Sequence, residues 1–212
     1  MKIVITAMTA LTLVTCTAAF SLYEQAPKPI GTAVIAEKPG KQVGGGAAVL
    51  LPESLTNRQS YLLKTAYATA KSEGFANPEV IQSILLQETH AGGLKVYKVA
   101  NPGPQAYYGV GQIKLAAARD VMSRYPDLYE KFGFHTKTDD EIKANLILND
   151  EYNIVVMTKY VKLLQNQYGF SGRQLVNAYN RGPGGVQTVG SDFHYAVGAE
   201  QKLAKYKRVG RL

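Results

Sequence analysis

Glu88 is the residue whose type and position most clearly indicate chemistry. It follows Ile81, Ile84 and Leu85 at the spacing of one helical face, so a carboxyl group ends an apolar stripe. Burial against that stripe disfavours the charged carboxylate, and the negative end of a helix disfavours it again. Both effects raise the pKa, as a general acid working near neutral pH requires. A structural Glu paired with an Arg or Lys is the alternative, because ion pairs also occupy helix faces.

A helix over residues 78–90 must position this carboxyl group. Asn77 is a preferred N-cap, and Pro78 suits the first helical position. The glycine pair at 92–93 is expected to stop the helix. Glu88 would then lie in the last turn.

The rest of the chain after about Ser54 has the pattern of helices joined by turns, which predicts a mainly α domain over residues 54–212. The expected helices cover residues 57–72, 78–90, 112–124, a short segment after Thr138, 150–168, 173–180 and 192–209. A long irregular stretch over residues 91–111 separates the second helix from the third. Loops of this length in compact domains are often functional.

Residues 1–53 differ in character from the predicted domain. Lys2, an uncharged stretch over residues 3–20 and small residues at 17–19 are typical of a secretory signal peptide (residues 1–19), with cleavage expected after Ala19. An uncleaved membrane anchor is the alternative, and Cys16 raises a less favoured one, lipoprotein processing. Residues 20–53 are rich in Pro and Gly, which predicts a linker or loosely ordered arm. We therefore expect an exported protein with no transmembrane anchor after cleavage.

Composition restricts the partners and cofactors. The formal net charge of +8 favours anionic surroundings, which include nucleic acid, a membrane surface or an acidic polymer. Basic residues are spread through the chain and are densest only at its tail, and the predicted signal peptide argues further against a nucleic-acid binder. The single Cys lies in that signal peptide and the three His have no ligand spacing, so no metal and no cofactor are expected.

Four separated stretches, within residues 57–189, resemble one protein family. They are Gln87-Glu88-Thr89, Tyr108-Gly109-Val110-Gly111-Gln112-Ile113, Asn149-Asp150-Glu151-Tyr152-Asn153-Ile154 and Ala178-Tyr179-Asn180-Arg181-Gly182-Pro183-Gly184. In this order they resemble the lysozyme-like domain of bacterial and phage lytic transglycosylases, the soluble-lytic-transglycosylase type related to goose-type lysozyme. The sequence departs from the family at Gly111, where Met is common, and after Thr89, where a Pro and an aromatic residue are missing.

The resemblance implies a lysozyme-like helical fold and cleavage of peptidoglycan glycan strands in the periplasm or cell wall. Glu88 would act as general acid and then as base on the C6 hydroxyl of N-acetylmuramic acid, which leaves a 1,6-anhydro sugar. The hydroxyl of Tyr179 would bond the carboxyl of Glu88, while Asn180 and Gln112 would bind sugar amides. Thr89 is expected to belong to the substrate-binding residues with Gln112, Tyr179 and Asn180, where it would either orient Glu88 or cap the helix end.

Two alternatives to the transglycosylase remain. A muramidase on the same fold would use water in place of the C6 hydroxyl, but most glycosidases need a second carboxylate. Asp120, Asp150 and Glu151 are expected to cap helices or form surface pairs instead. A non-catalytic peptidoglycan-binding protein is a different class, against which the ionisable Glu88 on an apolar stripe argues. Wall turnover, a secretion or conjugation apparatus and a phage assembly are all compatible settings.

Overall fold

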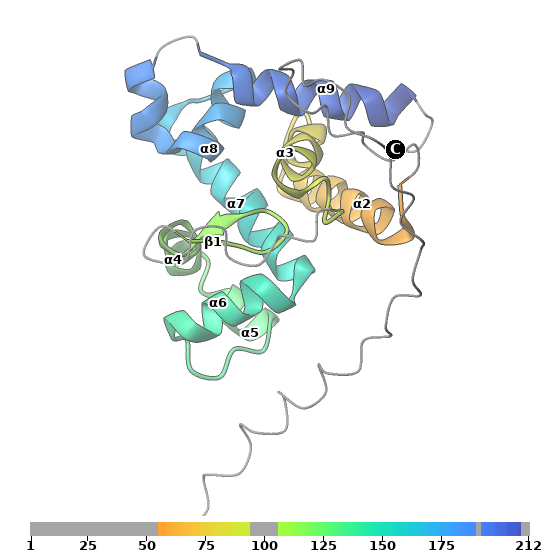
Figure 1. Ribbon diagram of the computed structural model, residues 1–212. Helices are drawn as coiled ribbons and strands as arrows, with labels where there is room; N and C mark the ends of the chain where they lie inside the picture. Colours follow the sequence, from red (N-terminus) through yellow and green to blue (C-terminus); the bar gives the residue numbers. More distant parts are fainter. Residues whose placement is uncertain (1–54, 94–105, 190–191, 209–212) are drawn as a thin grey trace, which may run out of the picture. The chain divides into compact units, whose positions relative to one another are not determined.

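The computed structural model describes residues 55–93, 106–189 and 192–208, which belong to one unit spanning Leu50–Leu212 (Figure 1). The predicted signal peptide and arm, and part of the predicted long loop, lie outside the described residues. None of the helices in the described ranges combines the length and the apolar composition needed to cross a membrane.

Within these ranges the fold is mainly helical, as the sequence predicted. The helices are α2 (Asn57–Ser72), α3 (Glu79–Thr89), α4 (Leu115–Arg124), α5 (Asp127–Lys131), α6 (Asp139–Leu148), α7 (Asp150–Tyr168), α8 (Gly172–Val189) and α9 (His194–Arg208). The strands β1 (Tyr107–Tyr108) and β2 (Ile113–Lys114) pair antiparallel. The strands and α5 were not predicted, because elements of two to five residues are too short to show a periodicity.

Helix α7 runs through the middle of the domain and contacts α2, α4, α6 and α8 (Figure 1). The apolar face predicted for it is buried, with Ile154, Met157, Val161 and Leu164 at most 2% exposed. The side chain of Asn149 caps its start by accepting a hydrogen bond from the backbone N–H of Tyr152. Gly169, in the left-handed conformation at φ 68°, ends it. The sequence therefore specified both the length and the buried face of the central helix.

Helix α9 lies across α3 and α8 (Figure 1). Small residues line the contact: Ala196 and Ala199 are fully buried, and a Cβ added to Gly198 would lie 3.2 Å from Oε1 of Gln87. This close approach brings the side chains of α9 to the last turn of α3. That turn contains Glu88.

Helix α3 ends earlier than expected. Its last residue is Thr89, and His90 and Ala91 follow with φ of 51° and 54°. The glycine pair therefore comes after the stop and does not cause it. Gly93 instead allows close packing, because an added Cβ would lie 2.4 Å from Nε2 of Gln59, which donates to the carbonyl of His90 at 2.8 Å.

Two further helix boundaries differ from the predicted ones. Helix α4 begins at Leu115, three residues after the expected start, because β2 takes up the residues before it. Helix α8 continues past Asn180 to Val189, across a break at Gly182 with φ 75° and ψ 166°. Pro183 then opens the second part, where its missing N–H costs no hydrogen bond.

Candidate active site

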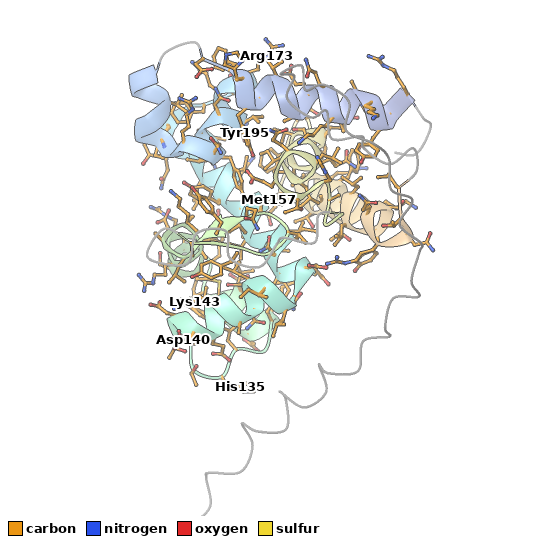
Figure 2. All side chains as sticks on the ribbon, in the orientation of Figure 1. His135, Asp140, Lys143, Met157, Arg173 and Tyr195 are labelled. Carbon is orange, nitrogen blue, oxygen red and sulfur yellow. The ribbon has the colours of Figure 1, made fainter. Side chains whose placement is uncertain are left out.

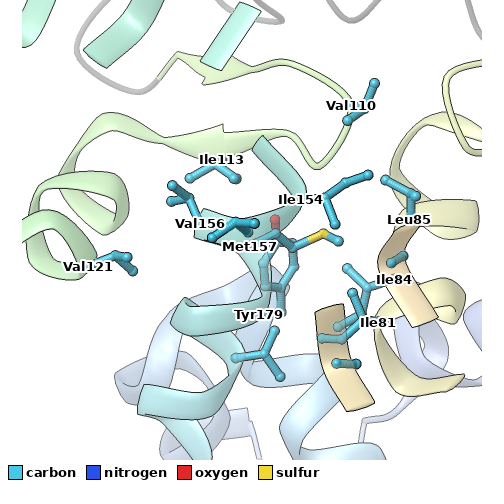
Figure 3. Close-up of a cluster of buried hydrophobic side chains, with 14 of the residues drawn as sticks. Ile81, Ile84, Leu85, Val110, Ile113, Val121, Ile154, Val156, Met157 and Tyr179 are labelled. Carbon is cyan, nitrogen blue, oxygen red and sulfur yellow. The ribbon is translucent and has the colours of Figure 1, made fainter. Parts of the chain in front are cut away.

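Glu88 lies in the last turn of α3 and is half-buried. Ile81, Ile84 and Leu85, which precede it on the same face, are fully buried in the core (Figure 3). Burial raises the pKa of Glu88 from 4.5 to about 7. The predicted direction of the shift and burial as its cause are confirmed. The carboxyl group is therefore partly protonated near neutral pH.

A tyrosine of α9 contacts this carboxyl group. The hydroxyl of Tyr195 donates a hydrogen bond to Oε1 of Glu88, and Figure 2 shows Tyr195 on α9 near its junction with α3 and α8. The expected bond from Tyr179 is not formed, because its hydroxyl donates to the carbonyl of Gly111 at 2.5 Å. Tyr179 still lies near the site, since the charge of Glu88 contributes to the raised pKa of its hydroxyl.

Lys202 brings a positive charge to the same helix end. It lies two turns after Tyr195 on the same face of α9, and its Nζ donates to the carbonyl of Gln87 at 3.3 Å. A cation near the last carbonyls of a helix is favourable, and here it also lowers the pKa of Glu88. Burial outweighs this effect and that of the Tyr195 hydrogen bond, so the pKa of Glu88 stays raised.

A buried asparagine of α7 holds the loop that follows β1. Asn153 is fully buried, and its side-chain oxygen accepts from the N–H of Gly111 at 2.8 Å. Its amide nitrogen donates to the carbonyls of Tyr108 and Leu146, both at 2.9 Å. The bonds to Gly111 and Tyr108 tie β1 and its loop to α7, and the bond to Leu146 ties α6 to α7. Asn153 therefore has a structural role that sequence reasoning missed. A polar residue in the middle of an apolar helix face was the available signal.

Gly111 has no room for a side chain. An added Cβ would lie 2.8 Å from Oδ1 of Asn153, 3.0 Å from Sδ of Met157 and 3.3 Å from the hydroxyl of Tyr179. Met157 and Tyr179 lie side by side in Figure 3. The thioether of Met157 on α7 therefore occupies part of the space that a side chain at position 111 would need.

A groove lies beside this loop, and its lining includes Tyr107, Gln112, Lys114, Tyr160, Tyr179 and Asn180. The structure therefore brings Gln112, Tyr179 and Asn180 together. Glu88 does not line the groove, but its charge acts on Tyr179, which does. Gln112 has φ 50° at the turn of the hairpin, and its Nε2 donates to the carbonyl of Gly109 at 2.8 Å. Asn180 is exposed to solvent. Side-chain amides at such positions can both donate to and accept from a ligand amide.

Thr89 does not reach the groove. It is 2% exposed, and its hydroxyl donates to the carbonyl of Val110 at 2.7 Å and accepts from the N–H of Gly92 at 2.9 Å. This corrects the prediction that Thr89 binds substrate, because the buried hydroxyl is occupied by the backbone. Of its two predicted roles, the structure supports the cap at the helix end.

Within the described residues, the three other candidate carboxylates do not act on Glu88. The three candidates are paired or exposed: Asp120 bonds Arg124 at 3.0 Å, Asp150 bonds Arg58 at 2.5 Å, and Glu151 faces solvent. None of them is among the groups that shift the pKa of Glu88. In the described ranges, no group of three or more His, Cys, Asp or Glu residues could hold a metal ion.

Comparisons with protein-family models, curated proteins and solved structures found no match to this chain. Its function must therefore be argued from the chemistry of Glu88 and the groove.

Replacing Tyr195 with Phe should raise the pKa of Glu88. The hydrogen bond from Tyr195 stabilises the charged carboxylate, and the variant cannot form it. If Glu88 acts as an acid, activity falls as pH rises through its pKa, so the alkaline limb of the rate should move to higher pH. We also expect a loss of about tenfold in rate at the optimum, typical of a hydrogen bond to a charged group. The measurement is the pH profile of the rate of the reaction in which Glu88 takes part.

Tyr206→Phe is the matched control on the same helix. The hydroxyl of Tyr206 is buried and has no hydrogen-bond partner among the described residues. Its removal should leave the pH profile unchanged. Equal shifts in the two variants would mean that the Tyr195 hydroxyl does not act on Glu88.

Proposed function

We propose that this protein is an exported peptidoglycan lytic transglycosylase with a lysozyme-like fold. It cleaves the β-1,4 bond between N-acetylmuramic acid and N-acetylglucosamine and forms 1,6-anhydromuramic acid ends. The observation that carries this proposal is Glu88, a half-buried carboxyl with a pKa of about 7 and a tyrosine hydroxyl on one oxygen. A general acid for glycosidic cleavage needs such a pKa.

In the first step, protonated Glu88 donates its proton to the bridging glycosidic oxygen, and the bond from that oxygen to C1 of the muramic acid breaks. The 2-acetamido group of the same sugar stabilises the positive charge at C1. Glu88 is now a carboxylate, and the hydroxyl of Tyr195 stabilises its charge through the hydrogen bond described above.

In the second step, the carboxylate of Glu88 removes the proton of the C6 hydroxyl, and O6 forms a bond with C1. The products are a 1,6-anhydro sugar and a free 4-hydroxyl, and Glu88 is protonated again. No water is consumed. Because O6 and C1 belong to one ring, the attack has a high effective molarity.

Two features of the described residues support this route. Among the described residues, no second carboxylate contributes to the pKa shift of Glu88, whereas a hydrolase needs a second carboxylate to activate a water across the sugar ring. The groove offers the amides of Gln112 and Asn180 for the acetamido groups of the glycan, together with the rings of Tyr107 and Tyr160.

The test is a digest of purified peptidoglycan followed by mass analysis of the fragments. We expect fragments that end in 1,6-anhydro-N-acetylmuramic acid, each lighter by one water than the hydrolytic product and without a reducing end. If borohydride instead reduces the muramic acid ends of the fragments, the cleavage is hydrolytic and the protein is a muramidase. Binding without any cleavage would favour the non-catalytic peptidoglycan-binding protein.

A further inference from the structure

We propose that Lys114 forms an anion subsite in the groove, which binds a carboxylate attached to the muramic acid of the glycan. The carboxylate belongs either to the lactyl group of that sugar or to its peptide stem. This inference rests on the proposed function, because it assigns a charge preference to the substrate of the same site.

The hairpin places Lys114 in the groove. Tyr107 and Lys114 are direct cross-strand partners in the β1–β2 pair, and both are half-buried. The Nζ of Lys114 lies 5.1 Å from the centroid of the Tyr107 ring. A cation over an aromatic ring at this distance is attracted to it, which restrains an otherwise flexible side chain. The ammonium group is therefore held in position at the wall of the groove.

The charge balance of the groove favours an anion. Among the described residues, its lining includes two cations, Lys114 and Arg181, and no carboxylate. The charge of Asp120 acts on the lining residue Tyr160, but Asp120 is paired with Arg124. Arg181 is neutralised by Asp192, at 2.7 Å. Lys114 has no carboxylate within ion-pair distance among the described residues, and residues 94–105, which precede the hairpin, contain no Asp or Glu. A positive charge without a counter-ion in a concave surface attracts anionic ligands.

The glycan has the matching chemistry. Its acetamido groups suit Gln112 and Asn180, which lie in the same groove as Lys114. Its negative charge comes from carboxylates, either on the peptide stem or, where the stem has been removed, on the lactyl group. A chito-oligosaccharide has the same acetamido groups but no carboxylate. Lys114 therefore gives the groove a higher affinity for charged muramic acid glycans than for neutral chitin-like ones.

The experiment measures binding in the Glu88→Gln background, where no turnover occurs. Three probes are compared by calorimetry: a stem-bearing glycan oligomer, the same oligomer stripped by an amidase, and a chito-oligosaccharide of equal length. Adding Lys114→Met should weaken binding of one or both charged oligomers about three- to tenfold and leave the chito-oligosaccharide unchanged. The oligomer that loses affinity identifies the source of the carboxylate.

Lys137→Met is the matched control. The Nζ of Lys137 lies 5.2 Å from the centroid of the Tyr129 ring, outside the groove lining, so the same charge is lost from a similar contact. This variant should bind all three probes as before. Lys114→Arg should keep the preference for the charged oligomers. High salt should reduce the difference in affinity between the protein that retains Lys114 and the Lys114→Met variant.

Two results would overturn the inference while leaving the proposed function in place. One is an equal loss of affinity for all three probes, and the other is no loss for any of them, in each case with normal cleavage by the wild-type protein. A wild-type protein that neither binds nor cleaves any glycan would instead overturn the proposed function, and this inference with it.

Discussion

Replacing Glu88 with Gln should reduce the rate of glycan cleavage at least about a hundredfold, the low end of typical contributions from acid–base groups. The amide keeps the shape of the side chain but has no proton to deliver at the glycosidic oxygen. The measurement is the initial rate of release of anhydro fragments from purified peptidoglycan.

Glu79→Gln is the control for this variant. Glu79 lies in the first turn of the same helix and pairs with Lys207 at 2.5 Å, away from the groove lining. The same change of carboxyl to amide there should leave the rate near that of the wild type. A loss at Glu88 that does not exceed the loss at Glu79 would mean that another group supplies the proton.

The Glu88→Gln variant should also change how stability depends on pH. The folded protein holds the pKa of Glu88 at about 7 against 4.5 in an unfolded chain, so the folded state keeps its proton in that interval and the unfolded state loses it. Wild-type stability should therefore fall between about pH 4.5 and pH 7, by at most about 3 kcal/mol. The stability of the Glu88→Gln variant should not fall in this way, because its amide does not titrate. Denaturant unfolding at both ends of the interval measures the difference.

Gly109→Ala should be strongly destabilising. Gly109 has φ 70°, and a Cβ there would lie 1.9 Å from the carbonyl oxygen of Leu146 and 2.2 Å from Nδ2 of Asn153. The loop must move away from α6 and α7, which breaks the hydrogen bonds between Asn153 and the backbone of Tyr108 and Gly111. We expect a loss of at least about 3 kcal/mol in the free energy of unfolding.

Gly133→Ala is the control that separates the steric clash at position 109 from the cost of a left-handed backbone conformation. Gly133 has φ 67°, but an added Cβ there would meet no atom within 4 Å. Its variant should lose only about 1–2 kcal/mol, the cost of a left-handed conformation for Ala. Equal losses at the two glycines would show that the contact between the loop and α7 does not contribute.

Gly109→Ala should also weaken glycan binding. The carbonyl of Gly109 accepts the hydrogen bond that orients Gln112, so a displaced loop carries that amide out of the groove. Isothermal titration with a glycan oligomer measures the loss in whatever fraction stays folded.

Local patterns were enough to predict the helix that carries the acid. The 3.6-residue spacing of Ile81, Ile84 and Leu85 placed Glu88 on a buried face, and the structure confirms both the burial and the raised pKa. The same periodicity predicted the buried face of α7. These features depend on residues within a few turns of one another, which a single sequence displays directly.

The shortest elements could not be predicted from the periodicity of apolar residues. Two-residue strands and the turn at Gln112 have no periodicity, so the start of α4 was predicted three residues too early. The end of α3 depends on the left-handed residues His90 and Ala91, which are not glycines and give no stop signal. The errors in the predicted elements are therefore of two kinds: the shortest elements were missed, and helix boundaries were displaced where local propensity is weakest.

The sequence by itself determined a mainly helical domain and a carboxyl group of perturbed pKa within it. Only the tertiary structure decided which groups act on that carboxyl. Tyr195 lies 107 residues from Glu88 and reaches it because Gly198 lets α9 approach α3 closely. Such a contact depends on how two helices pack, and the spacing of residues along either helix does not contain it.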